Sequence, residues 1–235
     1  MAALIHIETS TSACSVAFSQ DNRIIWNREN YDGQSHSVLL GKYIDELLAF
    51  ARTSGIVPDG VVVSCGPGSY TGLRIGVSTA KGVAFGLDLP LLSVNTLQVM
   101  ANHIVKNFNV DDNTWLCPMI DARRMEVYTS FYDKNLHHIR DIRAEIIDEN
   151  SYSDIPEEQK ILCFGNGAEK CKNVLNHPDI EFIDNINPLA KDMVELAEKA
   201  FLNKEFQDVA YFEPFYLKEF VATTPKNKVI EGSNY

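Results

Sequence analysis

The hydrophobic and polar positions of this chain switch repeatedly between the period of a strand and that of a helix. Residues 36–51 are the clearest helical case, because their apolar side chains recur at i, i+3, i+4 and i+7 and so share one face. The expected elements of the first half are strands at 4–9, 14–18, 24–27, 60–65 and 89–93, and helices at 36–51, 69–86 and 96–106. Strands alternating with helices predict an α/β unit.

A polar, turn-rich stretch at 108–113 then interrupts the pattern, which starts again after it. The second half is expected to contain strands at 115–121, 126–132, 139–147 and 161–164, and a helix at 188–203. The sequence therefore predicts two α/β lobes of similar plan. We place the N-terminal lobe at 1–107, the C-terminal lobe at 108–217 and a tail at 218–235, with the last helix able to pack back on the N-terminal lobe.

The helix expected at 69–86 carries almost no charge. Between Gly66 and Leu87, Arg74 and Lys81 are the only ionisable side chains other than a tyrosine. A helix this apolar must be buried or covered by another protein. Gly72, Gly76 and Ala80 are spaced four apart and form a ridge that lets a second helix approach closely. This spacing favours helix packing over nucleotide binding.

Composition narrows the class of protein. Hydrophobic residues make up 45% of the chain and charged residues 23%, as in ordinary globular proteins. No apolar run is long enough for a membrane span, and the first residues lack the basic region of a secretory signal, so a cytoplasmic protein without a membrane role is expected. The net charge of −11 argues against this chain holding a nucleic acid unaided, and Arg123-Arg124 is only a small basic spot.

The motifs of catalysis and metal binding do not appear. The glycine turn has Thr71 where both a P-loop and a dinucleotide fingerprint require glycine. The histidines form no HxxxH or HExxH pair, no GxSxG elbow occurs, and the five cysteines contain no CxxC pair, so we expect neither a metal site nor a catalytic constellation. Glu8 and the hydroxyl residues after it could hold phosphate and a metal's water shell, but on these residues alone a simple turn is the better interpretation.

Several segments together resemble one family. They are IETST at 7–11, QSHS at 34–37, GPGSYTGLRIG at 66–76, DARR at 121–124 and EVY at 126–128. In these residues the chain resembles the TsaB (YeaZ) family, a bacterial subunit of the tRNA threonylcarbamoyladenosine machinery. The resemblance covers roughly residues 3–135 and thins to GNGA at 165–168 and PFYL at 214–217.

The resemblance implies a two-lobed fold of the actin-like ATPase class (acetate kinase/hsp70/actin, RNase H-like) with a degenerate nucleotide cleft. It implies a non-catalytic subunit that supports the catalytic TsaD, together with the small ATPase TsaE. Such a chain forms a homodimer in isolation, meets tRNA only through the complex and requires no cofactor of its own, although the complex uses ATP. Vestigial cofactor binding is expected at Glu8, Thr9 and Ser10. The family usually has Asp at position 8, and the longer Glu8 weakens the case for independent ATP hydrolysis.

The resemblance also implies an interface through the helices at 36–51 and 69–86. The expected contact residues are Leu40, Tyr43, Ile44, Leu47, Gly72, Leu73, Gly76, Val77 and Ala80. Two other functions stay open on the sequence. One is a stand-alone ATP-dependent phosphotransferase or ATPase of the same fold, and the other is a homodimeric interaction module with an unrelated partner.

Overall fold

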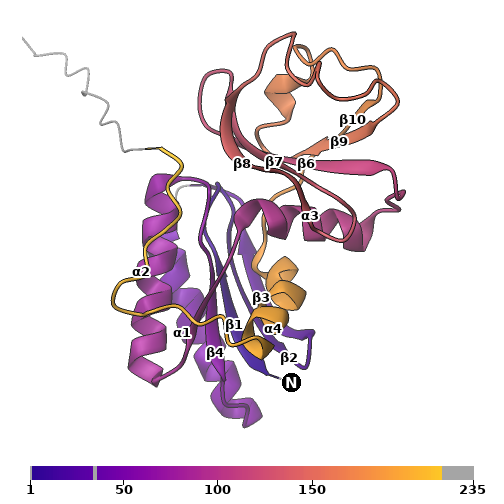
Figure 1. The fold of residues 1–235 in the computed structure, drawn as a ribbon. Coiled ribbons are helices and arrows are strands. Elements are labelled where there is room, and N and C mark those ends of the chain that lie inside the picture. Colours follow the sequence, from indigo (N-terminus) through magenta and orange to yellow (C-terminus); the bar gives the residue numbers. More distant parts are fainter. Residues whose placement is uncertain (1, 34–35, 219–235) are drawn as a thin grey trace, which may run out of the picture.

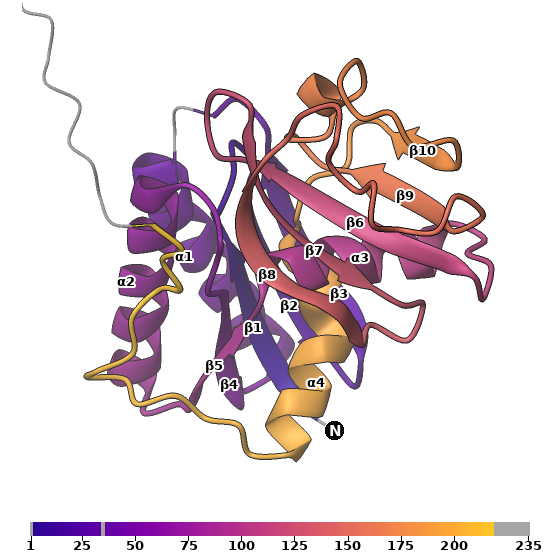
Figure 2. The same cartoon turned by 45° about the horizontal axis from the view of Figure 1, so that its top comes forward.

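The computed structural model describes residues 2–33 and 36–218, which form two lobes (Figures 1 and 2). A five-stranded sheet in the order β3-β2-β1-β4-β5 forms the first lobe. Its strands are β1 (Ala3–Glu8), β2 (Cys14–Gln20), β3 (Arg23–Asn30), β4 (Gly60–Ser64) and β5 (Leu91–Val94). The first three are antiparallel neighbours, whereas β4 and β5 continue the sheet in parallel to β1. Asp21 and Asn22, both with positive φ, form the two-residue turn between β2 and β3.

Helices α1 (His36–Ser54) and α2 (Tyr70–Leu87) make the crossovers of this lobe and lie side by side on one face of the sheet (Figure 1). The apolar stripe predicted for α1 is confirmed. Its buried members are Leu40, Ile44, Leu47 and Ala51. They pack with the side chains that β1, β2 and β4 direct to the same face.

The second lobe repeats the plan of the first. Its sheet has the order β10-β9-β6-β7-β8, again an antiparallel meander extended by two parallel strands. The strands are β6 (Thr114–Asp121), β7 (Glu126–Tyr132), β8 (His138–Ile146), β9 (Lys160–Phe164) and β10 (Ile180–Ile183). The expected two-lobed α/β fold is therefore confirmed. Strand β10 was not predicted, because its four residues carry no fully buried side chain and hence no strong apolar pattern.

Helix α3 (Thr96–Asn107) joins the lobes and is buried against both of them. Leu97, Met100 and Ile104 pack on the second sheet, while Val99 packs on the opposite side with residues of β4 and β5. Within the described residues, none of the helices is both long and apolar enough to span a membrane.

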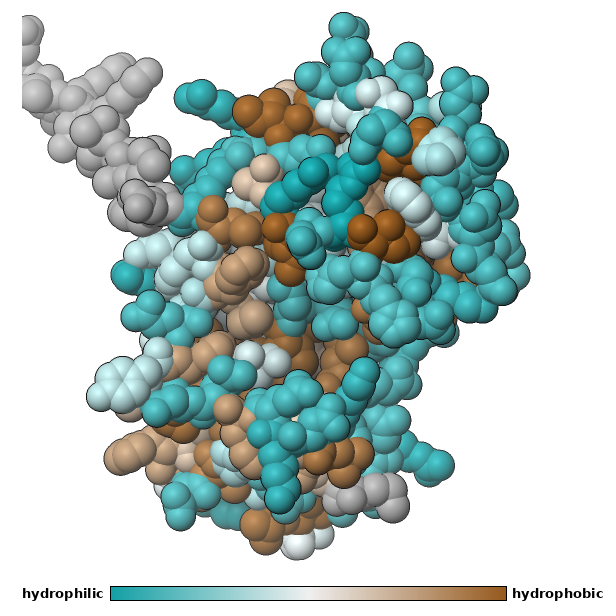
Figure 3. All heavy atoms as spheres, viewed as in Figure 1, coloured by the Kyte–Doolittle hydropathy of each residue, from teal (hydrophilic) through white to brown (hydrophobic). Residues whose placement is uncertain are grey.

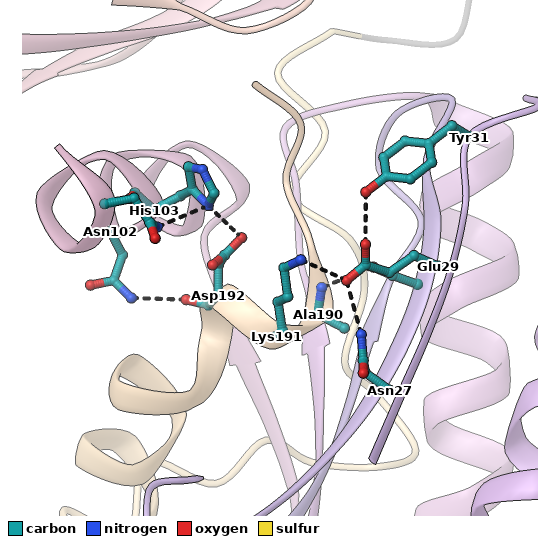
Figure 4. Close-up of polar contacts among 10 residues, drawn as sticks. Asn27, Glu29, Tyr31, Asn102, His103, Ala190, Lys191 and Asp192 are labelled. Atoms are coloured by element: carbon teal, nitrogen blue, oxygen red, sulfur yellow. Dashed lines mark hydrogen bonds and ion pairs between the residues drawn. The ribbon is translucent and has the colours of Figure 1, made fainter. Parts of the chain in front are cut away.

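The chain returns to the first lobe through the short 3-10 helix η2 (Ala190–Met193) and helix α4 (Val194–Leu202). The helix expected at 188–203 was thus predicted too long at its start, because Leu189 is extended and the first turn after it is 3-10. Polar contacts fix η2 between the lobes (Figure 4). The Asp192 carboxylate pairs with His103 Nδ1 (2.9 Å), and the Asp192 backbone carbonyl accepts from the Asn102 side-chain amide (2.8 Å). Lys191 forms an ion pair with Glu29 (2.9 Å), and Ala190 N–H donates to the Ser15 hydroxyl (2.9 Å).

A histidine is buried at the centre of the first sheet. His6 on β1 is 0% exposed, and its Nε2 pairs with the Ser19 hydroxyl at 2.7 Å, while its Nδ1 has no partner. Burial disfavours the charged imidazole and lowers the pKa of His6 to about 3. The folded protein therefore keeps His6 neutral at pH values where the unfolded chain would protonate it.

This difference predicts that acid lowers the free energy of unfolding and that His6 is responsible for part of the effect. The pKa of His6 is lowered on folding, so the unfolded state binds one more proton between about pH 6.5 and 3, and stability falls as pH falls through this window. Below pH 6 the free energy of unfolding of the wild type should fall about 1.4 kcal/mol per pH unit more steeply than that of His6→Gln. Urea unfolding at several pH values measures both slopes. Equal slopes for wild type and His6→Gln would contradict the prediction.

Candidate functional site

A cleft of about 610 Å³ opens where the two lobes meet. One wall comes from the first lobe, namely the loop after β1 (Ser10–Ser12) and the start of α2 with the turn before it (Gly68–Gly72). The other wall comes from the second lobe, namely the turn after β6 (Asp121–Arg123) and Asn166. Lys218, the last described residue, also lines it. The cleft is thus built from the motifs 7–11, 66–76 and 121–124 that carry the family resemblance. In the motif at 34–37, His36 also lines the cleft, and Gln34 and Ser35 lie outside the described residues.

The first wall depends on a very close approach between the end of β1 and the start of α2. A Cβ atom added to Gly72 would lie 2.0 Å from the carbonyl oxygen of Thr9, and one added to Gly76 would lie 2.2 Å from the Thr9 hydroxyl. That hydroxyl donates to the Gly72 carbonyl (2.8 Å), and Ser69 N–H donates to the Ser10 carbonyl (2.6 Å). The ridge predicted at Gly72 and Gly76 is therefore real, but the loop after β1 packs on it, and the prediction of a second helix there is corrected.

Helix α2 begins at the cleft with its backbone N–H groups. The Ser69 hydroxyl caps it by accepting the Gly72 N–H (3.3 Å), and the first turn contains no acidic side chain. The aligned peptide dipoles leave partial positive charge at this end. Helix geometry therefore gives the first wall donors for an anion, without the lysine of a P-loop.

Of the three residues predicted to bind a cofactor, only Ser10 lines the cleft. Glu8 is 0% exposed and Thr9 is 2% exposed, and neither lines the cleft, so cofactor binding at these two residues stays a prediction. Glu8 instead accepts the Ser10 N–H at 2.5 Å and stabilises the loop from below. Burial raises the pKa of the Glu8 carboxyl, and its hydrogen bonds oppose this only in part.

The second wall is a turn held in an unusual conformation. Arg123 and Arg124 both have positive φ (70° and 48°), which is rare for residues other than glycine. Asp121 accepts the Arg123 N–H (3.0 Å), and the Lys170 ammonium donates to the carbonyls of Arg124 and Glu126 (2.7 Å each). The turn presents Arg123 to the cleft. The pair appeared in the sequence only as a small basic spot, because their place opposite α2 depends on contacts distant in sequence.

The cleft therefore offers N–H groups, hydroxyls and two cationic side chains, a set that suits an anionic group. Its one carboxylate, Asp121, already accepts from Arg123 N–H and from the Lys170 ammonium. Within residues 2–33 and 36–218, no group of three or more His, Cys, Asp or Glu side chains is placed to hold a metal ion.

The residues predicted to contact a partner lie mostly in the core of the first lobe. Eight of the nine are buried within this chain, and Tyr43 is half-buried. The buried ones are Leu40, Ile44, Leu47, Gly72, Leu73, Gly76, Val77 and Ala80. They cover the sheet and expose little surface, so the predicted interface at these eight residues stays a prediction. The apolar stripe of each helix faces its own sheet.

The outer faces of α1 and α2 have a different composition. Val38 and Phe85 are 74% and 83% exposed. A Cβ atom added to Gly41, Gly82 or Gly86 would have no neighbour within 4 Å among the described residues, so packing within the described part of the chain does not require these glycines. Figure 3 shows pale and brown residues among teal ones over the α2 side of the first lobe. The sequence pattern did not single out these exposed positions, of which Gly82 and Gly86 form a second small ridge on α2.

Comparisons with known proteins agree with this architecture. The family model described as "TsaD: tRNA N6-adenosine threonylcarbamoyltransferase" matches residues 30–226. The TsaB protein of Escherichia coli, named for tRNA threonylcarbamoyladenosine biosynthesis, is 28% identical over 93% of this chain and 96% of its own. The TsaB protein of Haemophilus influenzae is 28% identical over 93% and 94%. The structure of YeaZ from Pseudomonas aeruginosa superposes with a TM-score of 0.79 at 23% identity, over 92% of this chain and all of that one, and so shows the same fold.

The two kinds of glycine on α2 predict opposite effects of the same substitution. Gly72→Ala should lower the free energy of unfolding by about 3 kcal/mol or more, because its methyl group meets the backbone of Thr9. Gly82→Ala, in the same helix, should raise it by up to about 1 kcal/mol, because alanine favours the helix and meets no atom. Urea unfolding of the two variants tests this, and equal effects would contradict the packing of α2 on Thr9.

Proposed function

The chain belongs to the TsaB (YeaZ) family, and on that basis we propose that it acts in tRNA threonylcarbamoyladenosine biosynthesis as a non-catalytic subunit that binds and supports a TsaD-like catalytic subunit. The match of a TsaD-type family model to most of the chain supports a partner of the same fold, because two similar α/β subunits can pair through equivalent helices.

The outer face of α1 and α2 is the observation that carries this proposal. A glycine inside a helix costs about 1 kcal/mol relative to alanine, and within residues 2–33 and 36–218 no atom lies close enough to Gly41, Gly82 and Gly86 to require one. Ser78, Gly82 and Gly86 instead form a ridge on which a second helix could pack closely. Val38 and Phe85 supply exposed apolar contact area on the same helices.

The remaining parts of the proposal concern the assembly. A TsaE-like ATPase joins the two subunits, the complex uses ATP, and this chain requires no cofactor of its own. In isolation the helix face pairs with a second copy of the chain. Contact with tRNA occurs only through the complex, in keeping with the net charge of −11. The assembly works in the cytoplasm, where the five unpaired cysteines would stay reduced.

A stand-alone phosphotransferase has less support. Such an enzyme needs a carboxylate that reaches the nucleotide, its metal or the attacking group. Glu8, the acid at the end of the first strand, is fully buried and outside the cleft, and Asp121 is held by its own turn.

The interface can be tested with one substitution. Gly82→Arg places a long charged side chain on the outer ridge without touching the core. It should leave folding unchanged and weaken binding of the TsaD-like subunit about 30-fold or more, the size of an interface hot spot. Isothermal titration calorimetry with the purified partner from the same organism measures this, and circular dichroism checks the fold.

The matched control is Ser153→Arg, which adds the same charge at an exposed position of the second lobe. It should bind the partner as the wild type does. Wild-type affinity of Gly82→Arg would show that the ridge is not the interface. No complex with the wild-type chain would remove the proposed subunit role altogether.

A further inference from the structure

The last described segment, residues 207–218, crosses the first lobe outside α2 and ends at the cleft (Figures 1 and 2). We call it the C-terminal strap. It begins with a single backbone bridge, Gln207 N–H to the Leu91 carbonyl (2.8 Å). Further along, one side chain of α2 holds it: the Lys81 ammonium donates to the carbonyls of Ala210 and Phe212, each at 3.0 Å. Lys81 is thus one polar anchor of the strap on α2, and Arg74, on the same helix, hydrogen-bonds the Tyr216 side chain further along.

The strap next contacts the turn that precedes α2. Phe215 N–H donates to the Cys65 carbonyl at 2.7 Å. A Cβ atom on Gly66 would lie 2.8 Å from the Phe215 carbonyl oxygen, and Gly66 also has φ +112°. Glycine at position 66 therefore allows both the positive φ of the turn and the close approach of the docked strap. This turn continues directly into Gly68–Gly72, the first wall of the cleft.

The end of the strap reaches the cleft itself. The ring of Tyr216 packs on Tyr70 with centroids 5.0 Å apart, and the Arg74 guanidinium lies 4.5 Å from the centre of the same Tyr70 ring. Lys218 forms an ion pair with Glu126 on β7, in the second lobe. Both Tyr70 and Lys218 line the cleft. The strap therefore connects the outer side of α2, the glycine turn and the second lobe.

The contacts that hold the strap are few and separate. Apart from the bridge at Gln207, the described strap forms no helix or strand. Tyr211 is 84% exposed and Phe215 is 42% exposed, while Val209 and Phe212 contribute partly buried area to the core of the first lobe. Segments with little buried area and few backbone bonds open at a lower free energy than the fold as a whole.

We propose that the C-terminal strap is a conformational latch that couples the side of α2 to the interlobe cleft. In the docked state, Lys81 holds the strap, and the strap holds the turn at 65–68 and the Tyr70 ring. When Lys81 loses its two carbonyls, the strap separates as a unit and the wall of the cleft loosens with it. The latch thus has two states that a contact beside Lys81 can bias.

One consequence rests on the proposed partner surface. Phe85 and Gly82 border a groove whose other side is strap residues 208–210. A partner helix seated on the outer ridge of α2 would contact this groove and shift the strap between its states. The latch itself does not depend on that partner, and its test needs only the isolated chain.

Native-state hydrogen exchange read by mass spectrometry tests the latch in the full chain. Lys81→Met keeps the aliphatic stem but removes both hydrogen bonds. It should speed exchange at 207–217 and also at 65–72 by about tenfold or more, the effect expected from losing charged hydrogen bonds. Strand β9, and the parts of β6 and β7 outside 121–126, should exchange as in the wild type.

Two further variants are compared with Lys81→Met. Lys42→Met removes an exposed lysine of α1 that pairs only with Glu46 at 3.8 Å, and it should change neither segment. Lys218→Met should speed exchange near 216–218 and at 121–126 while leaving 208–212 protected. Faster exchange of the strap alone, with 65–72 unchanged in Lys81→Met, would overturn the coupling. Unchanged exchange in both segments would overturn the latch.

Discussion

The contact between the Thr9 backbone and the glycines of α2 determines how this molecule is arranged. Because Gly72 and Gly76 have no side chain, the end of β1 can touch the helix, and the loop 10–12 comes to lie beside the first turn of α2. The same contact directs the inner stripe of α2 onto the sheet and leaves the outer ridge exposed. The cleft wall and the inward face of α2 both follow from this close approach of Thr9 to the helix.

Rigidity between the lobes comes from elements that belong to both of them. Helix α3 is apolar on two sides and packs on both sheets, so the lobes cannot separate without exposing one of its faces. The 3-10 helix η2 adds directional bonds, since Asp192 binds α3 while Lys191 and Ala190 bind β3 and β2 (Figure 4). With the base of the molecule fixed in this way, the freedom that remains lies at the rim of the cleft, where the strap and the two facing turns meet.

Periodicity predicted most of the fold, because apolar spacing is a local property of the chain. It located both helices of the first lobe and the paired sheets, but it did not find β10, which is barely buried. How deeply a side chain is buried, and which residues far away in the sequence it contacts, are not local properties. The sequence does not reveal that Glu8 lies under its own loop, or that Lys81 binds carbonyls 129 and 131 residues away. The apolar stripe of α2 marks the inner ridge, which packs on its own sheet and loop, whereas the exposed ridge carries no apolar pattern that the sequence could reveal.

The cleft and the outer ridge support the same interpretation of this chain as a subunit that acts beside a partner. The cleft can hold an anion with N–H groups, Arg123 and Lys218, yet its carboxylate Asp121 is engaged in its turn and Glu8 is sealed beneath Ser10. These donors can position a charged group. Activating a nucleophile requires a group that accepts its proton, and among the described residues of the cleft His36, whose Nε2 lies 3.2 Å from the Ala13 carbonyl, is such a group. The outer ridge, by contrast, keeps glycines that lower helix stability and that no contact inside the chain requires. Glycines that lower helix stability without a benefit inside the chain are best explained by contact with another protein. This supports a subunit that acts through its partner.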